Sequence, residues 1–417
     1  MSSNNLLYAQ SGGVTAVINA TASAVIAAAR GESAVGDVFG ARNGILGVLG
    51  ERLVDTAGLT QADLLALAAT PGGAFGSCRF DLDDPAENPA QFDRLFRVFE
   101  AHRIGYFLYN GGNGSMDAVA KLSRAAEQRA YPLTCIGVPK TVDNDLEGTD
   151  CSPGFGSAAK YVATSMREAG LDLAAMASRI GRAFVMEVMG RNAGWLAAAS
   201  TLAQERRDDP PHLVLMPERS LDVERFLARV EAVVARFGYC AVTVSEGIRH
   251  ADGSPVMEQS HDRKGHVQLG GAGQSVSRMI QHKLGFKSHW SIPDYLQRAA
   301  GHLVSGVDRA QAEAVGRAAV RFAVEGRSGV MAAIRRLSDV PYTWDVIPVN
   351  AAEIANLERC VPDAFISGDG MGVSEAGRQF LAPLVQGEVT CRYEAGIPVY
   401  FRPDWADLRQ RLPGYDF

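Results

Sequence analysis

The sequence predicts an α/β protein whose strands form parallel sheets. Short β-prone runs repeatedly end in glycine or polar residues and give way to alanine-rich segments with helical periodicity, which is typical of βαβ units. The length of 417 residues exceeds that of one ordinary domain and favours two. Because the alternation occupies two halves of the chain, we expect two similar layers that face each other across a cleft.

The expected strands are apolar runs that stop abruptly at small or polar residues. They cover residues 6–9, 105–109, 134–138, 182–188, 213–216, 241–244 and 330–334. The expected helices cover residues 14–29, 115–128, 156–176, 191–204, 221–236, 271–284 and 309–325. Ligands of such folds bind outside the carboxyl ends of the strands, so functional side chains are expected there.

Two segments depart from this alternation. Residues 250–268 are polar and lack periodicity, which predicts a surface loop without a chemical role. The 79 residues from Asp339 onward contain proline, glycine and aromatic residues with weaker periodicity. They predict a small appended subdomain that packs on the rest.

Composition narrows the function classes. A net charge of −6, with acidic and basic residues mixed, argues against a nucleic-acid partner and against an anionic-membrane surface. The amino terminus resembles no export signal, and no run of 18 apolar residues occurs, so a cytoplasmic location is expected. The six cysteines show no metal-ligand spacing and are expected to be reduced.

Two predicted strands end in glycine-rich loops. They are LYAQSGG, with Gly12 and Gly13, and YNGGNGS, with Gly111, Gly112 and Gly114. Small residues at a strand-to-helix turn let backbone N–H groups approach phosphate oxygens, although a tight turn alone would also require glycine. Neither loop matches the GxxxxGK[ST] or the GxGxxG pattern.

A third glycine-rich stretch, PGGAFGSCRF, ends near an arginine. The guanidinium of Arg79 could bind a phosphoryl group through two parallel hydrogen bonds. An ordinary surface arginine is the alternative.

The stretch GVPKTVDND crowds charged and polar groups after an apolar run. If it is extended, Asp143 and Asp145 project to the same face. One carboxylate could then accept a proton while the other holds Mg²⁺, and Lys140 and Thr141 could contact a phosphate. The alternative is a turn rich in Asp and Asn that caps the segment beginning at Phe155.

Three later stretches supply groups suited to a sugar phosphate. EVMGRNAGW and VSEGIR follow predicted strands, and PDYLQR precedes a helix. Acidic side chains there can accept bonds from sugar hydroxyls, and arginines can bind phosphate. Glu246 and Arg298 could instead be members of structural ion pairs. The candidates are Met189, Gly190, Arg191, Glu246, Tyr295 and Arg298.

The motifs GGNGSMD, GVPKTVDND, EVMGRNAGW, VSEGIR and YLQR, in this order, resemble those of the phosphofructokinase family. The resemblance runs from about residue 5 to about residue 335 and is greatest to the pyrophosphate-dependent members. It implies two Rossmann-like three-layer αβα domains that face each other across a cleft, the phosphofructokinase fold, with a C-terminal extension. The implied donor domain is 1–153 with 298–345, and the implied fructose 6-phosphate domain is 154–297 with 346–417.

The resemblance also implies roles. Asp143 matches the catalytic base, Lys140 and Arg79 match catalytic contacts to the donor, and Asp145 matches a carboxylate linked to the Mg²⁺ cofactor. Asn113 takes the place of a second metal contact that is Asp in many relatives. The implied donor-binding residues are Gly12, Gly13, Gly112, Asn113, Gly114, Ser115 and Lys140. The implied substrate-binding residues are Thr141, Asp143, Met189, Gly190, Arg191, Glu246, Tyr295 and Arg298.

In this family a neighbouring subunit completes the sugar-phosphate site with basic residues. Arg182, Lys287 and His289 occupy the matching places, which implies a homodimer or a tetramer built of dimers.

The resemblance implies reversible phosphoryl transfer from pyrophosphate to the 1-hydroxyl of fructose 6-phosphate, in glycolysis and gluconeogenesis. Lys140 stands where pyrophosphate users carry lysine and favours this donor. Gly114 stands where pyrophosphate users commonly carry Asp, so it leaves room for ATP as the alternative donor. A catalytically silent sugar-phosphate sensor is the further alternative, against which the intact Asp143, Asp145 and Arg79 argue.

Overall fold

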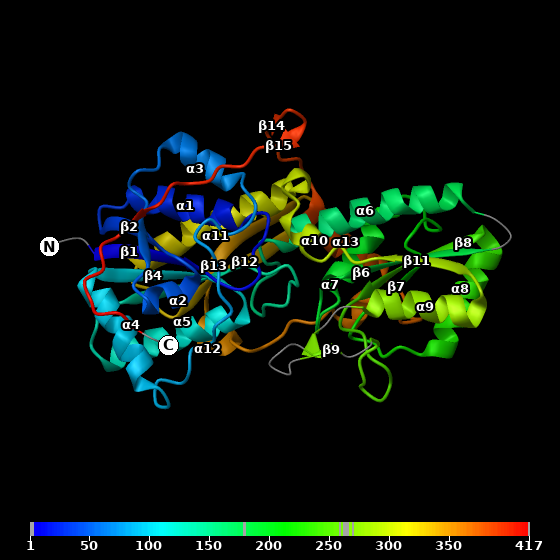
Figure 1. Ribbon diagram of the computed structural model, residues 1–417, viewed down its shortest axis with the longest axis horizontal. Coiled ribbons are helices and arrows are strands. Elements are labelled where there is room, and N and C mark those ends of the chain that lie inside the picture. Colours follow the sequence, from blue (N-terminus) through cyan, green and yellow to red (C-terminus); the bar gives the residue numbers. More distant parts are fainter. Residues whose placement is uncertain (1–3, 178–180, 258–259, 262–266, 269–270, 416–417) are drawn as a thin grey trace.

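The computed structural model describes residues 4–177, 181–257, 260–261, 267–268 and 271–415. Two lobes lie side by side along the long axis of the molecule (Figure 1). An eight-stranded sheet forms the first lobe, in the order β13-β12-β5-β4-β1-β2-β3-β16, and a four-stranded sheet, β11-β6-β8-β7, forms the second. Among the described residues, every helix is too short or too polar to traverse a bilayer.

The first lobe has a mostly parallel sheet between two helical layers. Its strands are β1 (Asn4–Gln10), β2 (Val35–Ala41), β3 (Leu53–Asp55), β4 (Ile104–Gly111), β5 (Thr134–Pro139), β12 (Val330–Asp339), β13 (Tyr342–Asn350) and β16 (Ala406–Asp407). Its helices are α1 (Ile18–Arg30), α2 (Gly44–Leu49), α3 (Gln61–Ala68), α4 (Pro89–Ala101), α5 (Asn113–Gln128), α11 (Gly306–Val324) and α12 (Ala351–Ile354).

The central strands of this sheet are buried on both faces, as their continuous apolar sequence requires. Leu6 and Leu108 pack in the core that also holds α1 and α11. Leu7 and Phe107, one residue away along each strand, pack in the core that holds α4 and α5. Successive side chains of a strand point to opposite faces, so one apolar run holds a helix layer on each side.

The second lobe repeats this plan on a smaller sheet in which all pairings are parallel. Its strands are β6 (Arg182–Val188), β7 (Leu213–Leu215), β8 (Tyr239–Ser245) and β11 (Lys287–Ser291). Its helices are α6 (Phe155–Ala175), α7 (Trp195–Ala199), α8 (Val223–Phe237), α9 (Ala272–Leu284), α10 (Tyr295–Ala299) and α13 (Glu375–Leu381). The fold class predicted from the sequence is confirmed.

The predicted elements differ from the observed ones where an apolar run is short or atypical. Helix α1 begins at Ile18 and not at residue 14, because the preceding residues form the glycine loop after β1. The predicted helix 191–204 shrinks to α7 and a 3₁₀ turn, Ser200–Ala203. In the predicted loop 250–268, the described residues contain one short hairpin, β9 (Ser260–His261) with β10 (Val267–Gln268).

The C-terminal region contacts both lobes, so parts of the segment 346–417, which the resemblance assigns to the second domain, lie on the first lobe. Strand β13 continues to Asn350 in the large sheet. Helix α13 packs on α7 in the second lobe, where Phe380 lies 5.7 Å from Trp195, ring centre to ring centre. The chain then forms the hairpin β14 (Tyr393–Glu394) and β15 (Ile397–Pro398) and returns to the large sheet as β16. The sequence lacks periodicity here because a segment that runs over the surface in irregular structure needs no continuous apolar face.

Candidate active site

A cavity of about 810 Å³ is lined by residues that follow strands of both sheets. From the first lobe these are the segments after β1, β4 and β5, together with residues 78–81. From the second lobe they are the segments after β6 and β8, together with α10. The carboxyl ends of the two sheets therefore face the same space, which is where ligands bind in folds of this kind.

Most of the predicted site residues line this cavity. From the first lobe they are Gly12, Gly13, Arg79, Gly112, Asn113, Gly114, Ser115, Lys140, Thr141, Asp143 and Asp145. From the second lobe they are Met189, Arg191, Glu246, Tyr295 and Arg298. Their roles in binding and catalysis stay predictions.

The loop after β1 brings backbone and three cations together. Gly12 has φ 71°, a left-handed value that favours glycine, and a Cβ on it would lie 3.2 Å from Lys140 Nζ. A Cβ on Gly13 would lie 2.4 Å from Arg298 Nη1 and 3.7 Å from Arg79 Nη2. The ends of three cationic side chains thus lie close to the backbone of this loop, and the converging charges make it suited to an anion with several oxygens.

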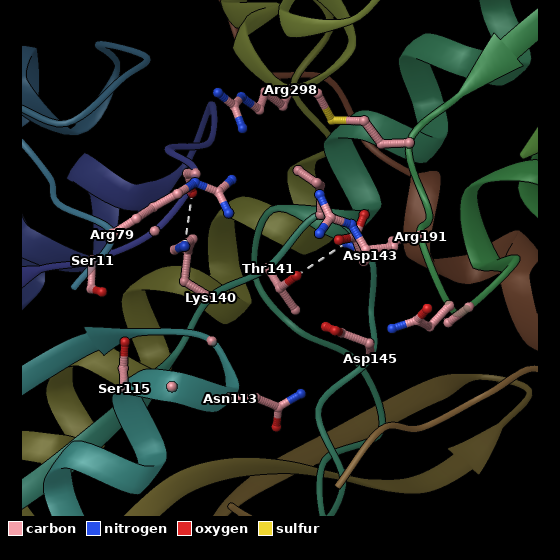
Figure 2. A pocket seen from close by; sticks show the side chains of 18 of the residues that line it. Ser11, Arg79, Asn113, Ser115, Lys140, Thr141, Asp143, Asp145, Arg191 and Arg298 are labelled. Atoms are coloured by element: carbon pink, nitrogen blue, oxygen red, sulfur yellow. Dashed lines mark hydrogen bonds between the residues drawn. The ribbon is translucent and has the colours of Figure 1, made fainter. Parts of the chain in front are cut away.

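Lys140 follows β5 and is buried, with 3% of its surface exposed. Its Nζ donates to the carbonyl oxygen of Gly13 at 2.7 Å, so the side chain crosses from one loop to the next (Figure 2). Burial, and then the positive charges of Arg79 and Arg298, lower the pKa of Lys140 to about 7. An anion in the cavity would restore the charged form by supplying the missing negative partner.

The acidic segment is a bent loop, so the condition that it is extended is not met. Asn144 has φ 54°, and its Oδ1 accepts a hydrogen bond from Ser152 N at 2.9 Å. Thr141 Oγ1 accepts one from Asp143 N at 3.1 Å. Two side chains of the loop thus bind backbone N–H groups, but neither caps the helix that begins at Phe155. Asp143 and Asp145 nevertheless both line the cavity, because the turn at Asn144 keeps the two side chains on the open side (Figure 2).

Asp143 has the environment of a proton acceptor that works near neutral pH. Its Oδ1 is buried and has no hydrogen-bond partner among the described residues. Burial, and then the negative charges of Asp145 and Glu246, raise the pKa of Asp143 to about 7. A carboxyl group with such a pKa can take a proton from a bound hydroxyl and return it later.

Asp145 and Asn113 both line the cavity and lie near each other, with the amide nitrogen of Asn113 turned toward Asp145 (Figure 2). Burial is the main cause that raises the pKa of Asp145, and Glu358 contributes. Asn113 Oδ1 is buried without a hydrogen-bond partner in the described part of the chain. Within that part, no three His, Cys, Asp or Glu side chains gather closely enough to hold a metal ion. Two oxygen ligands completed by phosphates and water suit Mg²⁺, which keeps most of its own shell.

The second-lobe side carries the groups predicted for a sugar phosphate. Arg298 lies over the ring of Tyr295 at 4.4 Å, a contact that orients its guanidinium. Glu246 Oε1 accepts from Gly190 N at 3.3 Å, and burial raises the pKa of Glu246. Gly190 itself does not line the cavity; its φ of 134° shapes the turn that presents Arg191.

Arg182, Lys287 and His289 lie outside the cavity. In the register of the sheet, Lys287 lies opposite Arg182. Both residues are at the amino-terminal ends of their strands, β11 and β6, away from the carboxyl ends that face the other lobe. Lys287 and His289 are exposed and alternate with the buried Ser288. One chain therefore does not bring these three residues to its own cavity.

Of the cavity residues that were not predicted as site residues, four are acidic or carry an amide: Asp81, Asn192, Asp294 and Glu358. Asn192 Nδ2 donates to Glu358 Oε1 at 2.6 Å, and this bond joins the second lobe to the segment that follows α12. Their acidic and amide character was visible, but the sequence gave no sign that residues so far apart would meet. Asp81 was the easiest of the four to predict from the sequence, since it follows the candidate residue Arg79 by two positions.

Comparison with known proteins agrees with this geometry. The family model described as phosphofructokinase matches residues 5–323. A protein of Methylococcus capsulatus named pyrophosphate–fructose 6-phosphate 1-phosphotransferase is 51% identical, with 96% of each chain covered. One of the same name from Xanthomonas campestris is 49% identical over the whole of both chains.

Solved structures give the same result. A crystal structure of a pyrophosphate-dependent phosphofructokinase from Nitrosospira multiformis has 46% sequence identity and a TM-score of 0.92, with both chains fully covered. The chain belongs to the phosphofructokinase family.

Proposed function

We propose that this protein transfers a phosphoryl group reversibly from pyrophosphate to the 1-hydroxyl of fructose 6-phosphate, giving fructose 1,6-bisphosphate and phosphate. The observation that carries this proposal is the unpaired, buried Oδ1 of Asp143 in a cavity that also holds Lys140, Arg79 and Arg298. A base and convergent cations are what phosphoryl transfer to an alcohol requires. Relatives about half identical to this chain carry the corresponding name.

The residues divide the work between the two lobes. Lys140, Arg79 and the backbone of Gly12 and Gly13 hold the donor phosphates from the first lobe. Arg298 and the segment after β6 hold the sugar phosphate from the second lobe. Asp143 accepts the proton of the attacking hydroxyl, and Arg79 balances negative charge that moves onto the leaving phosphate. Because the site already carries these charges in place, little reorganisation accompanies the transfer.

We assign Asp145 and Asn113 as the side chains that would hold Mg²⁺. Their oxygens are of the type that this ion prefers, and Asn113 Oδ1 lacks any other partner within the described residues. When bound, Mg²⁺ supplies neutralisation of phosphate charge. Thr141, in the same loop as Asp145, would donate a hydrogen bond to the phosphoryl group.

The test is a coupled assay of the purified protein with fructose 6-phosphate, Mg²⁺ and either pyrophosphate or ATP at equal concentration. We expect turnover with pyrophosphate and little with ATP. Turnover with ATP and none with pyrophosphate would assign the ATP-dependent activity that Gly114 leaves open. Binding of fructose 6-phosphate without turnover with either donor would assign the sensor.

We also propose that a second copy of the chain completes the sugar-phosphate site with Arg182, Lys287 and His289. Strand β11 is an edge strand of its sheet, and Trp290 and Ile292 next to these cations are 43% and 41% exposed. Exposed apolar side chains at a sheet edge are typical of a surface that another chain covers.

Lys287→Ala is expected to raise KM for fructose 6-phosphate by roughly tenfold, because one charge-assisted hydrogen bond to the phosphate is lost. KM for pyrophosphate should change little. Lys283→Ala, which removes an exposed lysine at the end of α9, is the matched control. Steady-state kinetics and sedimentation velocity check this; an unchanged KM for fructose 6-phosphate in a dimeric Lys287→Ala variant contradicts the assignment.

A further inference from the structure

A carboxylate occupies the space above Gly114 that a side chain at that position would fill. A Cβ built on Gly114 would lie 2.7 Å from Asp81 Oδ1. Both residues line the cavity, and both are exposed to it. The first turn of α5 therefore has no side chain of its own at Gly114, but it has a negative charge directly beside it.

The backbone that follows Asp81 is anchored to the first lobe by two hydrogen bonds. Leu82, the next residue, is buried, and its carbonyl oxygen accepts a hydrogen bond from Lys121 Nζ at 2.8 Å. Asp83 N donates to Gln91 Oε1 on α4 at 3.2 Å. Residues 82 and 83 are thus bound to α5 and α4. These bonds hold the backbone next to Asp81, and so keep its carboxylate beside Gly114.

The proposed function gives the donor a direction in the cavity. With Asp143 as the base and with Lys140 and Gly12 holding the donor, the transferred phosphoryl group would lie near Asp143 and the second phosphate on the first-lobe side. Gly114, two residues from Gly112, and Asp81 line the same cavity. A nucleoside triphosphate would have to extend beyond that second phosphate toward Gly114 and Asp81, whereas pyrophosphate would not.

We infer that Asp81 is a donor-specificity residue, which excludes nucleoside triphosphates by placing a carboxylate against their third phosphate. The inference rests on the proposed function, and it explains how Gly114 is compatible with a pyrophosphate donor. Repulsion of a competing ligand is an effective source of specificity, because it costs the true substrate nothing. The opening left by Gly114 is closed by a neighbouring residue.

The test compares donors in Asp81→Gly, which removes both charge and bulk. We expect the ratio of kcat/KM for ATP to kcat/KM for pyrophosphate to rise by roughly tenfold or more, chiefly through better use of ATP. Affinity for a non-hydrolysable ATP analogue, measured by calorimetry, should rise in parallel. Asp81→Asn keeps the shape and removes the charge, so its ratio should lie between those of the wild type and Asp81→Gly.

Asp83→Asn is the matched control, because it removes a carboxylate two positions away that does not line the cavity; its ratio should stay within about twofold of the wild type. The double variant Gly114→Asp with Asp81→Gly returns a carboxylate to the same space and should restore the wild-type preference. A folded Asp81→Gly variant that uses pyrophosphate and gains neither ATP turnover nor analogue binding overturns the inference. Failure of the wild type to use pyrophosphate overturns the proposed function instead, so the two failures are distinguishable.

Discussion

Asp143→Ser is expected to lower kcat for pyrophosphate-dependent phosphorylation of fructose 6-phosphate by about 10²- to 10⁴-fold. Serine cannot accept the proton of the sugar hydroxyl at neutral pH, whereas the carboxylate of Asp143 has an unpaired oxygen in the cavity for that purpose. The affinity for fructose 6-phosphate should stay nearly intact, since binding needs no base. Coupled kinetics and calorimetric titration with fructose 6-phosphate measure the two quantities.

Glu147→Gln is the control for this experiment. Glu147 belongs to the same loop and is acidic, but it does not line the cavity. Its substitution should leave kcat within about twofold of the wild type. Near-normal turnover of Asp143→Ser would show that another group takes the proton.

Lys140→Gly is expected to raise KM for pyrophosphate by about 10- to 100-fold, because a charge-assisted hydrogen bond in a buried site is lost. KM for fructose 6-phosphate should change much less, since Lys140 Nζ reaches toward the loop after β1 and not toward the second lobe. Initial rates at varied pyrophosphate and saturating fructose 6-phosphate test this.

Lys140→Met accompanies it as the matched variant, because methionine keeps most of the buried volume and removes the charge. If the charge matters, both variants show the higher KM; if only Lys140→Gly does, the side chain serves to fill space. An unchanged KM for pyrophosphate in both would remove the main argument for Lys140 as a donor contact.

The sheets and the location of the site could be predicted from sequence because both depend on local patterns. Buried parallel strands are mostly apolar, as in the AFVM run of β6, and the predicted range 182–188 of this strand matches the structure. The glycine loops and the acidic loop follow strands of this kind, so the rule that ligands bind at strand ends placed them correctly. The common location of Asp143 and Asp145 was predicted for the wrong reason, since a left-handed Asn144 produces it.

The remaining features depend on contacts between distant segments, which no local pattern encodes. Glu358 meets Asn192 across 166 residues, and β16 closes the edge of a sheet that begins at residue 4. Asp81 became informative only through its distance from Gly114. These are tertiary pairings of ordinary polar residues, and periodicity does not report them.

The dependence of kcat/KM on pH tests the central claim most directly, that Asp143 is the base and Lys140 the charged donor contact. Asp143, with its pKa raised to about 7, must lose its proton to act, so the rate should rise with pH through that value. Lys140, with its pKa lowered to about 7, must keep its proton, so the rate should fall above it. We predict a bell-shaped profile centred near neutrality, whose alkaline limb disappears in Lys140→Arg because guanidinium stays charged. A wild-type profile that is flat from pH 5 to 9 would contradict the account.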